Sequence, residues 1–387
     1  MRSLLTYAFR PFFLLNAVFA AVLIGLWGLV YQGFSFPGLP ANIINWHAHE
    51  MLVGFGMATI AGFILTAVAT WTGRKPVQGS LLLVLVLAWV AGRVAMALSG
   101  FLSAGQVMFI DMLFPVLLVV LVAREVFSAG SSRNYPIVFI TLLLALLNLI
   151  FHAGNIGWLP LSFNADRVSL YLLIHLILLL VTVISGRIVP SFTANWLRSK
   201  GHQQLPVCSP LVDRATIVLT IFTGLFATIV PFSPLTGVLA MAASLAHLIR
   251  LSRWRGLATR SEPLLFVLHV AYLWLPIGYL LTACAVFGWG VPATAALHAL
   301  TAGAIGLMVM AVTTRVSLAH TGRELHAARL TVLAYWVLML AVILRVVSPL
   351  SEHYMLLLNA SVCAWVGAFV LFILVYYPVL TGPRVDE

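Results

Sequence analysis

The chain is dominated by about twelve apolar runs, each 16 to 25 residues long, that follow one another from end to end. As a helix, a run of that length crosses the ~30 Å hydrocarbon core of a bilayer. Membrane-spanning strands would alternate apolar and polar residues, and these runs do not. Only 8% of the residues are charged, against roughly a quarter in soluble proteins. We therefore predict an all-α integral membrane protein, with residues 1–387 forming a single polytopic transmembrane domain.

The ends of the expected spans are placed to within a few residues. The spans are Phe12–Tyr31, His49–Thr70, Ser80–Leu98, Val107–Val122, Tyr135–Phe151, Val168–Val189, Ala215–Val230, Pro234–Ile249, Pro263–Phe287, Ala293–Thr314, Leu330–Val347 and Met355–Tyr377. The connection between Pro231 and Pro234 is very short, so a re-entrant turn is the alternative there. The first run is too long for the apolar core of a signal peptide and is expected to stay in the membrane.

The net charge of +11 comes from Lys and Arg in alternate connections, while the intervening connections are nearly free of them. The basic residues are Arg2, Arg10, Arg74, Lys75, Arg124, Arg133, Arg198, Lys200, Arg214, Arg250, Arg253, Arg255, Arg260, Arg323, Arg329 and Arg384. Cytoplasmic loops carry such an excess, so both termini are expected in the cytoplasm. The charge thus indicates topology, and no nucleic-acid partner is expected.

Ionisable residues within spans are costly and mark functional sites. With the N-terminus inside, they fall into two layers. The outer layer contains His47, His49, Glu50, Arg93, Asp111, His152, His175, His298 and Arg345. The inner layer contains Arg187, His247, His269 and Arg315. The purely structural interpretation is that these are interfacial histidines and arginines whose side chains reach toward the membrane surface. For Glu50, Asp111, Arg187 and Arg315, the functional interpretation is support of a metal site or a proton path.

The outer layer favours a metal or haem site, because spans two, six and ten each bring a histidine to a similar depth. These are His49, His175 and His298, and imidazole is the commonest ligand for iron, copper and zinc. A haem b between two spans would take one axial imidazole from each, with His49 and His298 preferred. Arg93 and Arg345 would then pair with its propionates. No CxxCH motif is present, so the haem would be non-covalent.

Two histidines of the second span compete for this role. His47 and His49 point about 200° apart on an α-helix, so they cannot easily bind one metal. Either they serve two sites, or one binds metal and the other lines the entrance. Glu50 shares a face with His47 and would orient its ring. His49 is slightly preferred because it lies deeper. Small residues that follow the histidines in spans two and ten fit close helix packing, room for a flat macrocycle, or both.

Several motifs recur in order along the chain. They are Phe9-Arg10-Pro11-Phe12-Phe13, Trp46-His47-Ala48-His49-Glu50-Met51, Ala61-Gly62-Phe63, Thr66-Ala67, Trp71-Thr72-Gly73, Gly186-Arg187, Pro190, Phe192-Thr193, Leu297-His298-Ala299-Leu300-Thr301, Gly303-Ala304-Ile305-Gly306, Arg315, Ser317-Leu318 and His320-Thr321-Gly322-Arg323. In these the chain resembles the NnrS family of bacterial membrane proteins over nearly its whole length. Ala319 departs from the glycine more usual in the family.

The resemblance implies a multi-pass protein of the bacterial inner membrane that is associated with haem and copper. It also implies a link to nitric oxide and to protection against nitrosative stress. It carries over His47, His49, Glu50, Arg187, His298, Arg315 and His320 as site positions without assigned roles. A more distant likeness is to the catalytic subunits of haem–copper oxidases and nitric oxide reductases. Those enzymes add a His-His pair on helix seven, which this chain lacks. A second metal would therefore draw first on His152 and His175.

The leading functional hypothesis is a haem-dependent oxidoreductase that binds nitric oxide from the bilayer and reduces or removes it. Such turnover would require an external electron donor, because no electron-entry domain is present. The alternatives are a haem or copper carrier, a nitric oxide sensor without turnover, and a proton-coupled secondary transporter whose histidines relay protons.

Overall fold

The computed structural model describes residues 3–385, in which the regular secondary structure is helical and no β-strand occurs. Twelve helices in this part of the chain are long and apolar enough to cross a membrane. The α-helices are α1 (Phe9–Tyr31), α2 (Ile43–His49), α3 (Met57–Thr72), α4 (Gly79–Ala97), α5 (Ala104–Ser128), α6 (Tyr135–Ile156), α7 (Ala165–Ser199), α8 (Pro210–Ile229), α9 (Pro234–Ser252), α10 (Pro263–Val286), α11 (Ala293–His298), α12 (Leu307–Ala319), α13 (Arg329–Val347) and α14 (Tyr354–Thr381). This confirms the predicted all-α fold with twelve spans.

Spans two and ten are each interrupted by a π-helical segment. Segment η2 (Glu50–Gly56) joins α2 to α3, and η6 (Ala299–Gly306) joins α11 to α12. The π-helix is rare and often marks a functional site. Periodicity in an apolar run could not indicate these segments, because every face of the run is apolar.

The chain divides into two compact units. Unit 1 comprises Met1–Leu173, His320–Arg323 and Tyr376–Glu387, and unit 2 comprises Ile174–Ala319 and Glu324–Val375. Each unit is described by itself below. A single transmembrane domain over residues 1–387 stays a prediction.

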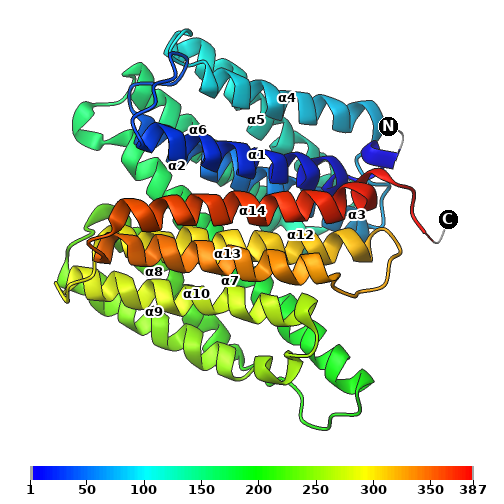
Figure 1. Cartoon of the computed structure of the whole chain (residues 1–387). Helices are drawn as coiled ribbons and strands as arrows, with labels where there is room; N and C mark the ends of the chain where they lie inside the picture. The colour runs from blue at the N-terminus through cyan, green and yellow to red at the C-terminus, as the bar shows by residue number, and fades with distance from the viewer. Residues whose placement is uncertain (1–2, 386–387) are drawn as a thin grey trace. The chain divides into compact units, whose positions relative to one another are not determined.

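Within unit 1, α4 packs against α5, α5 against α6, and α1 against α3 (Figure 1). Glycines permit the α1–α3 approach, since a Cβ at Gly62 would lie 2.9 Å from a ring carbon of Phe13. Small residues at such contacts are typical of membrane helices. The approach is also hydrogen-bonded: the Asn16 side-chain amide donates to the Thr59 hydroxyl at 2.7 Å. These contacts favour the interpretation that Gly62 serves close packing of α3 against α1.

The two ends of the chain meet in unit 1 (Figure 1). The buried Arg10 guanidinium donates to the carbonyl oxygens of Leu380 at 3.0 Å and Gly382 at 2.6 Å. The ring of Phe9 lies 5.7 Å from that of His320. Motifs from opposite ends of the sequence, Phe9-Arg10 and His320 to Arg323, therefore close the same end of this unit.

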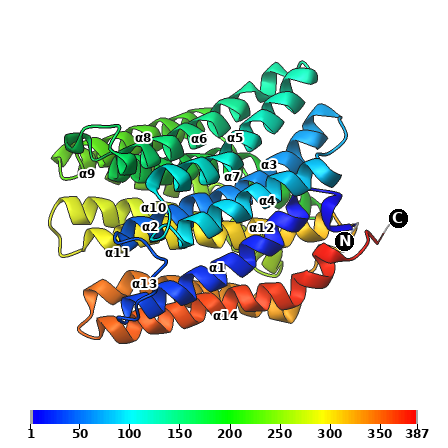
Figure 2. The same ribbon diagram turned by 90° about the horizontal axis from the view of Figure 1, so that it is seen from above.

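In unit 2, α9 lies between α8 and α10 (Figure 2). Helix α10 also contacts α11, η6 and α12, so it is the central helix of that unit. The short connection between α8 and α9 is a turn between two span-length helices. The re-entrant alternative for Pro231 to Pro234 is therefore wrong.

Helix α7 continues through Pro190 to Ser199, whereas the sequence predicted an end at Val189. Proline removes one backbone hydrogen bond, but ending the helix in hydrocarbon would leave more groups unpaired. The second span likewise begins earlier than predicted, at Ile43, so that both His47 and His49 are helical.

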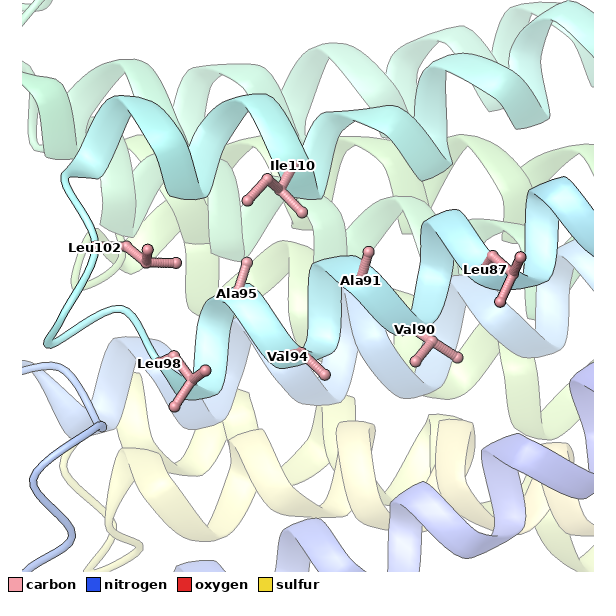
Figure 3. A pocket seen from close by; sticks show the side chains of 8 residues that line it. All are labelled: Leu87, Val90, Ala91, Val94, Ala95, Leu98, Leu102 and Ile110. Carbon is pink, nitrogen blue, oxygen red and sulfur yellow. The ribbon is translucent and has the colours of Figure 1, made fainter.

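A groove of about 540 Å³ lies along α4, beside its connection to α5 and the first part of α5 (Figure 3). The side chains that line it are all aliphatic: Leu87, Val90, Ala91, Val94, Ala95, Leu98, Leu102 and Ile110. Such a surface suits contact with lipid chains.

Candidate metal centre

The strongest candidate site is a cluster of two histidines and one aspartate inside unit 1. His49, Asp111 and His152 are all buried, and one ligand atom from each lies within 4.8 Å of the others. The Asp111 Oδ2 is 2.9 Å from His152 Nε2 and 3.4 Å from His49 Nε2. Two imidazoles and a carboxylate form a donor set that transition metals favour. Among the described residues, this is the group with metal-ligand spacing.

Two further charged side chains complete the cluster. The Arg93 guanidinium is buried and forms ion pairs with Glu50 and with Asp111. The remaining Glu50 contact is with His49, whose Nδ1 is 3.0 Å from Glu50 Oε1. Isolated charges in this environment would be very costly, and pairing offsets much of that cost. Arg93 therefore holds two buried carboxylates together.

Asn148 fixes the orientation of the cluster. Its side-chain NH₂ donates to Asp111 Oδ2 at 2.8 Å, so its carbonyl oxygen is the atom 2.8 Å from His49 Nε2. A carbonyl only accepts, so His49 Nε2 carries hydrogen. One more proton then lies between His49 Nδ1 and Glu50 Oε1, because a carboxylate and a bare imidazole nitrogen would leave that contact without hydrogen. With this proton the charges of the cluster balance: two negative carboxylates stand against the Arg93 guanidinium and the one shared proton.

The helices bring these groups together from four spans. His49 ends α2, Glu50 opens η2, Arg93 lies in α4 and Asp111 in α5. Asn148 and His152 are four residues apart in α6, so they share a face. Gly92 allows the close approach of α4 and α5, because a Cβ there would lie 2.8 Å from Asp111 Oδ1. Asn148 was not among the expected site residues, although an amide within an apolar run was a usable signal.

The two histidines of the second span have separate environments. His47 stacks on Trp27, with ring centroids 4.3 Å apart and planes 17° apart. His49 instead packs on Phe151 and faces the acidic cluster. The two rings therefore lie in different surroundings, as expected for residues two apart on a helix. The Glu50 carboxylate, expected to orient His47, is engaged by His49 and Arg93.

The remaining outer-layer residues lie in unit 2. His298 Nδ1 is 2.8 Å from the Thr294 carbonyl oxygen, so this nitrogen donates and Nε2 carries the lone pair of the neutral ring. His175 packs beside Gly224, and its Nδ1 is buried without a hydrogen-bond partner. Arg345 donates to the Ser348 hydroxyl at 3.3 Å.

His247, from the inner layer, belongs to a polar chain that the sequence did not reveal. Arg250 donates to Asp213 at 2.6 Å and to the Tyr272 hydroxyl at 3.2 Å. That hydroxyl is 2.8 Å from His247 Nδ1, and His247 Nε2 is 3.0 Å from the Thr220 hydroxyl. The partners come from three helices, so no linear spacing could indicate them.

The inner-layer arginines differ in their surroundings. Arg187 is exposed on α7. Arg315 lies over the Phe192 ring at 4.4 Å, so two separately recognised motifs meet in unit 2. His269 Nε2 is 2.9 Å from the hydroxyl of Thr193, the residue after Phe192.

Comparison with known proteins agrees with the motifs. The family model described as NnrS protein matches residues 3–384, which is nearly the whole chain. The chain belongs to the NnrS family. A search of curated proteins found no match to it. Membership supports a link to the nitric oxide response and an association with haem or metal, and the chain is a multi-pass membrane protein by its twelve apolar helices.

Proposed function

We propose that this NnrS-family chain is a bacterial inner-membrane protein that binds haem b and a second metal such as copper, and that binds and reduces nitric oxide. The observation that carries the proposal is the buried cluster of His49, Asp111 and His152 in a chain of this family. Ionisable groups inside a membrane are costly, so where they occur they generally serve a function. Removal of nitric oxide in the membrane would protect the cell from nitrosative stress.

The cluster fits the second metal by its chemistry. Two imidazoles and one carboxylate are a ligand set for iron, copper or zinc. Glu50 holds His49 through its other ring nitrogen, Nδ1, and Arg93 holds Asp111 through its other oxygen, Oδ1. His49 contacts oxygen atoms through both ring nitrogens. A metal ion must therefore displace a proton from His49, so metal affinity should fall as the pH falls.

His298 fits an axial haem ligand. A hydrogen bond from Nδ1 to a backbone carbonyl, as made to Thr294, is the usual way a protein directs the Nε2 lone pair toward a metal. His47 and His175 are the further imidazole candidates, because His49 is engaged in the cluster. Arg345 remains a candidate partner for a propionate, whereas the terminal nitrogens of Arg93 are occupied by two carboxylates.

When bound, haem and the metal would supply the redox chemistry and a binding site for nitric oxide. Reduction of two nitric oxide molecules to nitrous oxide and water consumes two electrons and two protons. The chain's own contribution is to hold a proton between His49 and Glu50 and, with that proton and Arg93, to keep the two carboxylates neutralised. Electrons would come from an external donor. Nitric oxide is apolar and dissolves in lipid, so it can approach through the bilayer.

Purified protein tests the proposal through its visible spectrum, oxidised and reduced, with metal analysis and a nitric oxide titration. We expect a b-type haem that acid-acetone extracts, a metal lost in His152→Ala, and a Soret band altered in His298→Ala. His320→Ala should leave the spectrum unchanged, because His320 lies beside Phe9 in another part of unit 1. Absence of both a Soret band and a bound metal would refute the proposal.

A proton-coupled secondary transporter is the second candidate. It is favoured by a specific observation: the cluster balances its own charges and pairs both ring nitrogens of His49, as a proton-binding site in a transporter would. In that case the purified protein would contain no metal, and Glu50→Gln would abolish proton-driven uptake into vesicles.

A further inference from the structure

The two π-helical segments are placed alike in the two units. Segment η2 begins directly after His49, and η6 begins directly after His298. Among the described residues these are the two π-helical segments. A π-helix widens one turn of an α-helix and changes the rotation of everything before it relative to everything after it. Each segment therefore sets the direction of the histidine that precedes it.

The spacing of glycine is also the same. Gly54 stands five residues after His49, and Gly303 stands five residues after His298. In a π-helix the N–H of one residue bonds to the carbonyl five residues earlier, so each glycine lies below its histidine on one face. An aromatic ring fills each place: a Cβ would lie 2.5 Å from a Phe19 ring carbon at Gly54, and 2.7 Å from the Trp274 indole at Gly303.

Each widened turn is also held from outside its own helix. In unit 1 the Trp89 indole N–H donates to the Gly54 carbonyl at 3.0 Å. In unit 2 a Cβ at Gly306 would lie 2.8 Å from the Trp365 ring. The wide turn is thus fixed by packing against tryptophan in both units.

The two halves of span two are anchored to different partners. Above η2, His49 contacts Asn148 of α6 at 2.8 Å, and below it the Thr59 hydroxyl accepts a hydrogen bond from Asn16 of α1 at 2.7 Å. Span ten has its own lower anchor, the 2.7 Å hydrogen bond between the hydroxyls of Thr314 and Tyr335. With the lower half fixed, the π-helical turn decides where each histidine points.

The neighbours of the two segments correspond as well. Segment η2 contacts α1, the helix of the preceding span, and α4, the helix of the following span. Segment η6 likewise contacts the preceding α10 and the following α13. The histidine, the π-helical turn, the glycine and two flanking helices therefore occur once in each unit.

We propose that η2 and η6 are a duplicated positioning element, which aims His49 at the second metal and His298 at the haem. The inference rests on the proposed function, because it assigns the task of these turns in ligand binding. His49 and His298 are the ligand candidates, and the turns act through them as positioning segments. Shortening either turn by one residue should then displace its histidine and lower binding of the group while the helix itself persists.

The test deletes one residue within each segment, Met51 in η2 and Ala302 in η6. Each deletion takes one residue out of the turn, so the histidine shifts relative to the rest of the helix by at most about 100° in rotation and about 1.5 Å along the axis. We expect deletion of Met51 to lower metal affinity and deletion of Ala302 to lower haem affinity, each by roughly 10- to 100-fold. Metal and haem per chain and the Soret position are the readouts. Met51→Ala and Ala302→Ser keep the length and should stay loaded.

Folding is checked by helix content and by elution as a single species. If a deletion variant does not assemble, Gly54→Ala and Gly303→Ala press a methyl group on Phe19 and Trp274 and should also lower occupancy. Gly367→Ala is their control, because its Cβ would lie 3.9 Å from its nearest neighbour. Full loading and an unchanged spectrum in assembled deletion variants would overturn the inference alone. A wild-type protein without haem or metal would instead overturn the proposed function, and the inference with it.

Discussion

Replacing Arg93 by methionine tests how the buried cluster is held together. Arg93 is the cation between the Glu50 and Asp111 carboxylates, and all three side chains are buried. Methionine keeps much of the length and removes the charge. The variant must then keep two carboxylates close together in a low-dielectric interior, or protonate one of them.

Two estimates of the cost agree. Removal of one partner from a buried ion pair costs about 3–5 kcal/mol. Protonation of a carboxyl group with an ordinary pKa near 4 costs about 1.4 kcal/mol per pH unit, or roughly 4 kcal/mol at pH 7. Because this second cost falls as the pH falls, the deficit of Arg93→Met should shrink by about 1.4 kcal/mol per unit between pH 7 and pH 5.

The assay is unfolding by SDS in mixed micelles at pH 7 and pH 5. Arg93→Met combined with Glu50→Gln should recover much of the loss, because one negative charge is then gone. Arg74→Met is the matched control: Arg74 is 41% exposed and pairs with Glu125 at 2.7 Å, so it should cost about 0–1 kcal/mol. A loss below about 1 kcal/mol for Arg93→Met at pH 7 would refute the account of the cluster.

Three further predictions concern other parts of the chain. Gly186→Ala should destabilise the protein by about 1–3 kcal/mol in the same assay, because its Cβ would overlap the Arg250 guanidinium. Burial and the nearby Arg384 lower the pKa of His320 in the folded protein. As the pH falls, the unfolded chain therefore binds a proton at His320 before the folded protein does, and this favours unfolding. The thermal midpoint should fall as the pH drops below about 6.5. Burial and the nearby Asp213 carboxylate raise the pKa of the Cys208 thiol, so an impermeant maleimide should label it slowly at pH 7, faster at higher pH, and only from the cytoplasmic side.

Each of these has a control and an opposing result. Gly367→Ala has space for its methyl group, and equal losses for both glycine variants would contradict the Arg250 contact. His320→Asn should flatten the pH dependence of the midpoint, and an unchanged slope would assign the effect to another group. Labelling of Cys208 from the periplasmic side would reverse the predicted topology.

The sequence determined the membrane class of this protein, because hydrocarbon forces any long apolar run to satisfy its own backbone as a helix. The number of spans followed from the same rule. The sequence also indicated most residues of the cluster, namely His49, Glu50, Arg93, Asp111 and His152. Each is a titratable residue within an apolar run, which can be recognised from the sequence alone. Their shared depth was readable from span position, given the inferred topology.

Only the tertiary structure decided which of these groups meet. Depth along a span does not give rotation about its axis, and in spans two and ten the rotation changes at a π-helical turn that an all-apolar run cannot encode. Arg93 was expected to pair with a haem propionate, but it lies between two carboxylates of the chain itself. His152 lies in the same cluster as His49. For the same reason, the sequence indicated His247 as a candidate but could not indicate Tyr272 and Asp213, which belong to the same polar chain in the fold. These partners become neighbours through helix packing, which depends on side-chain shape across several helices.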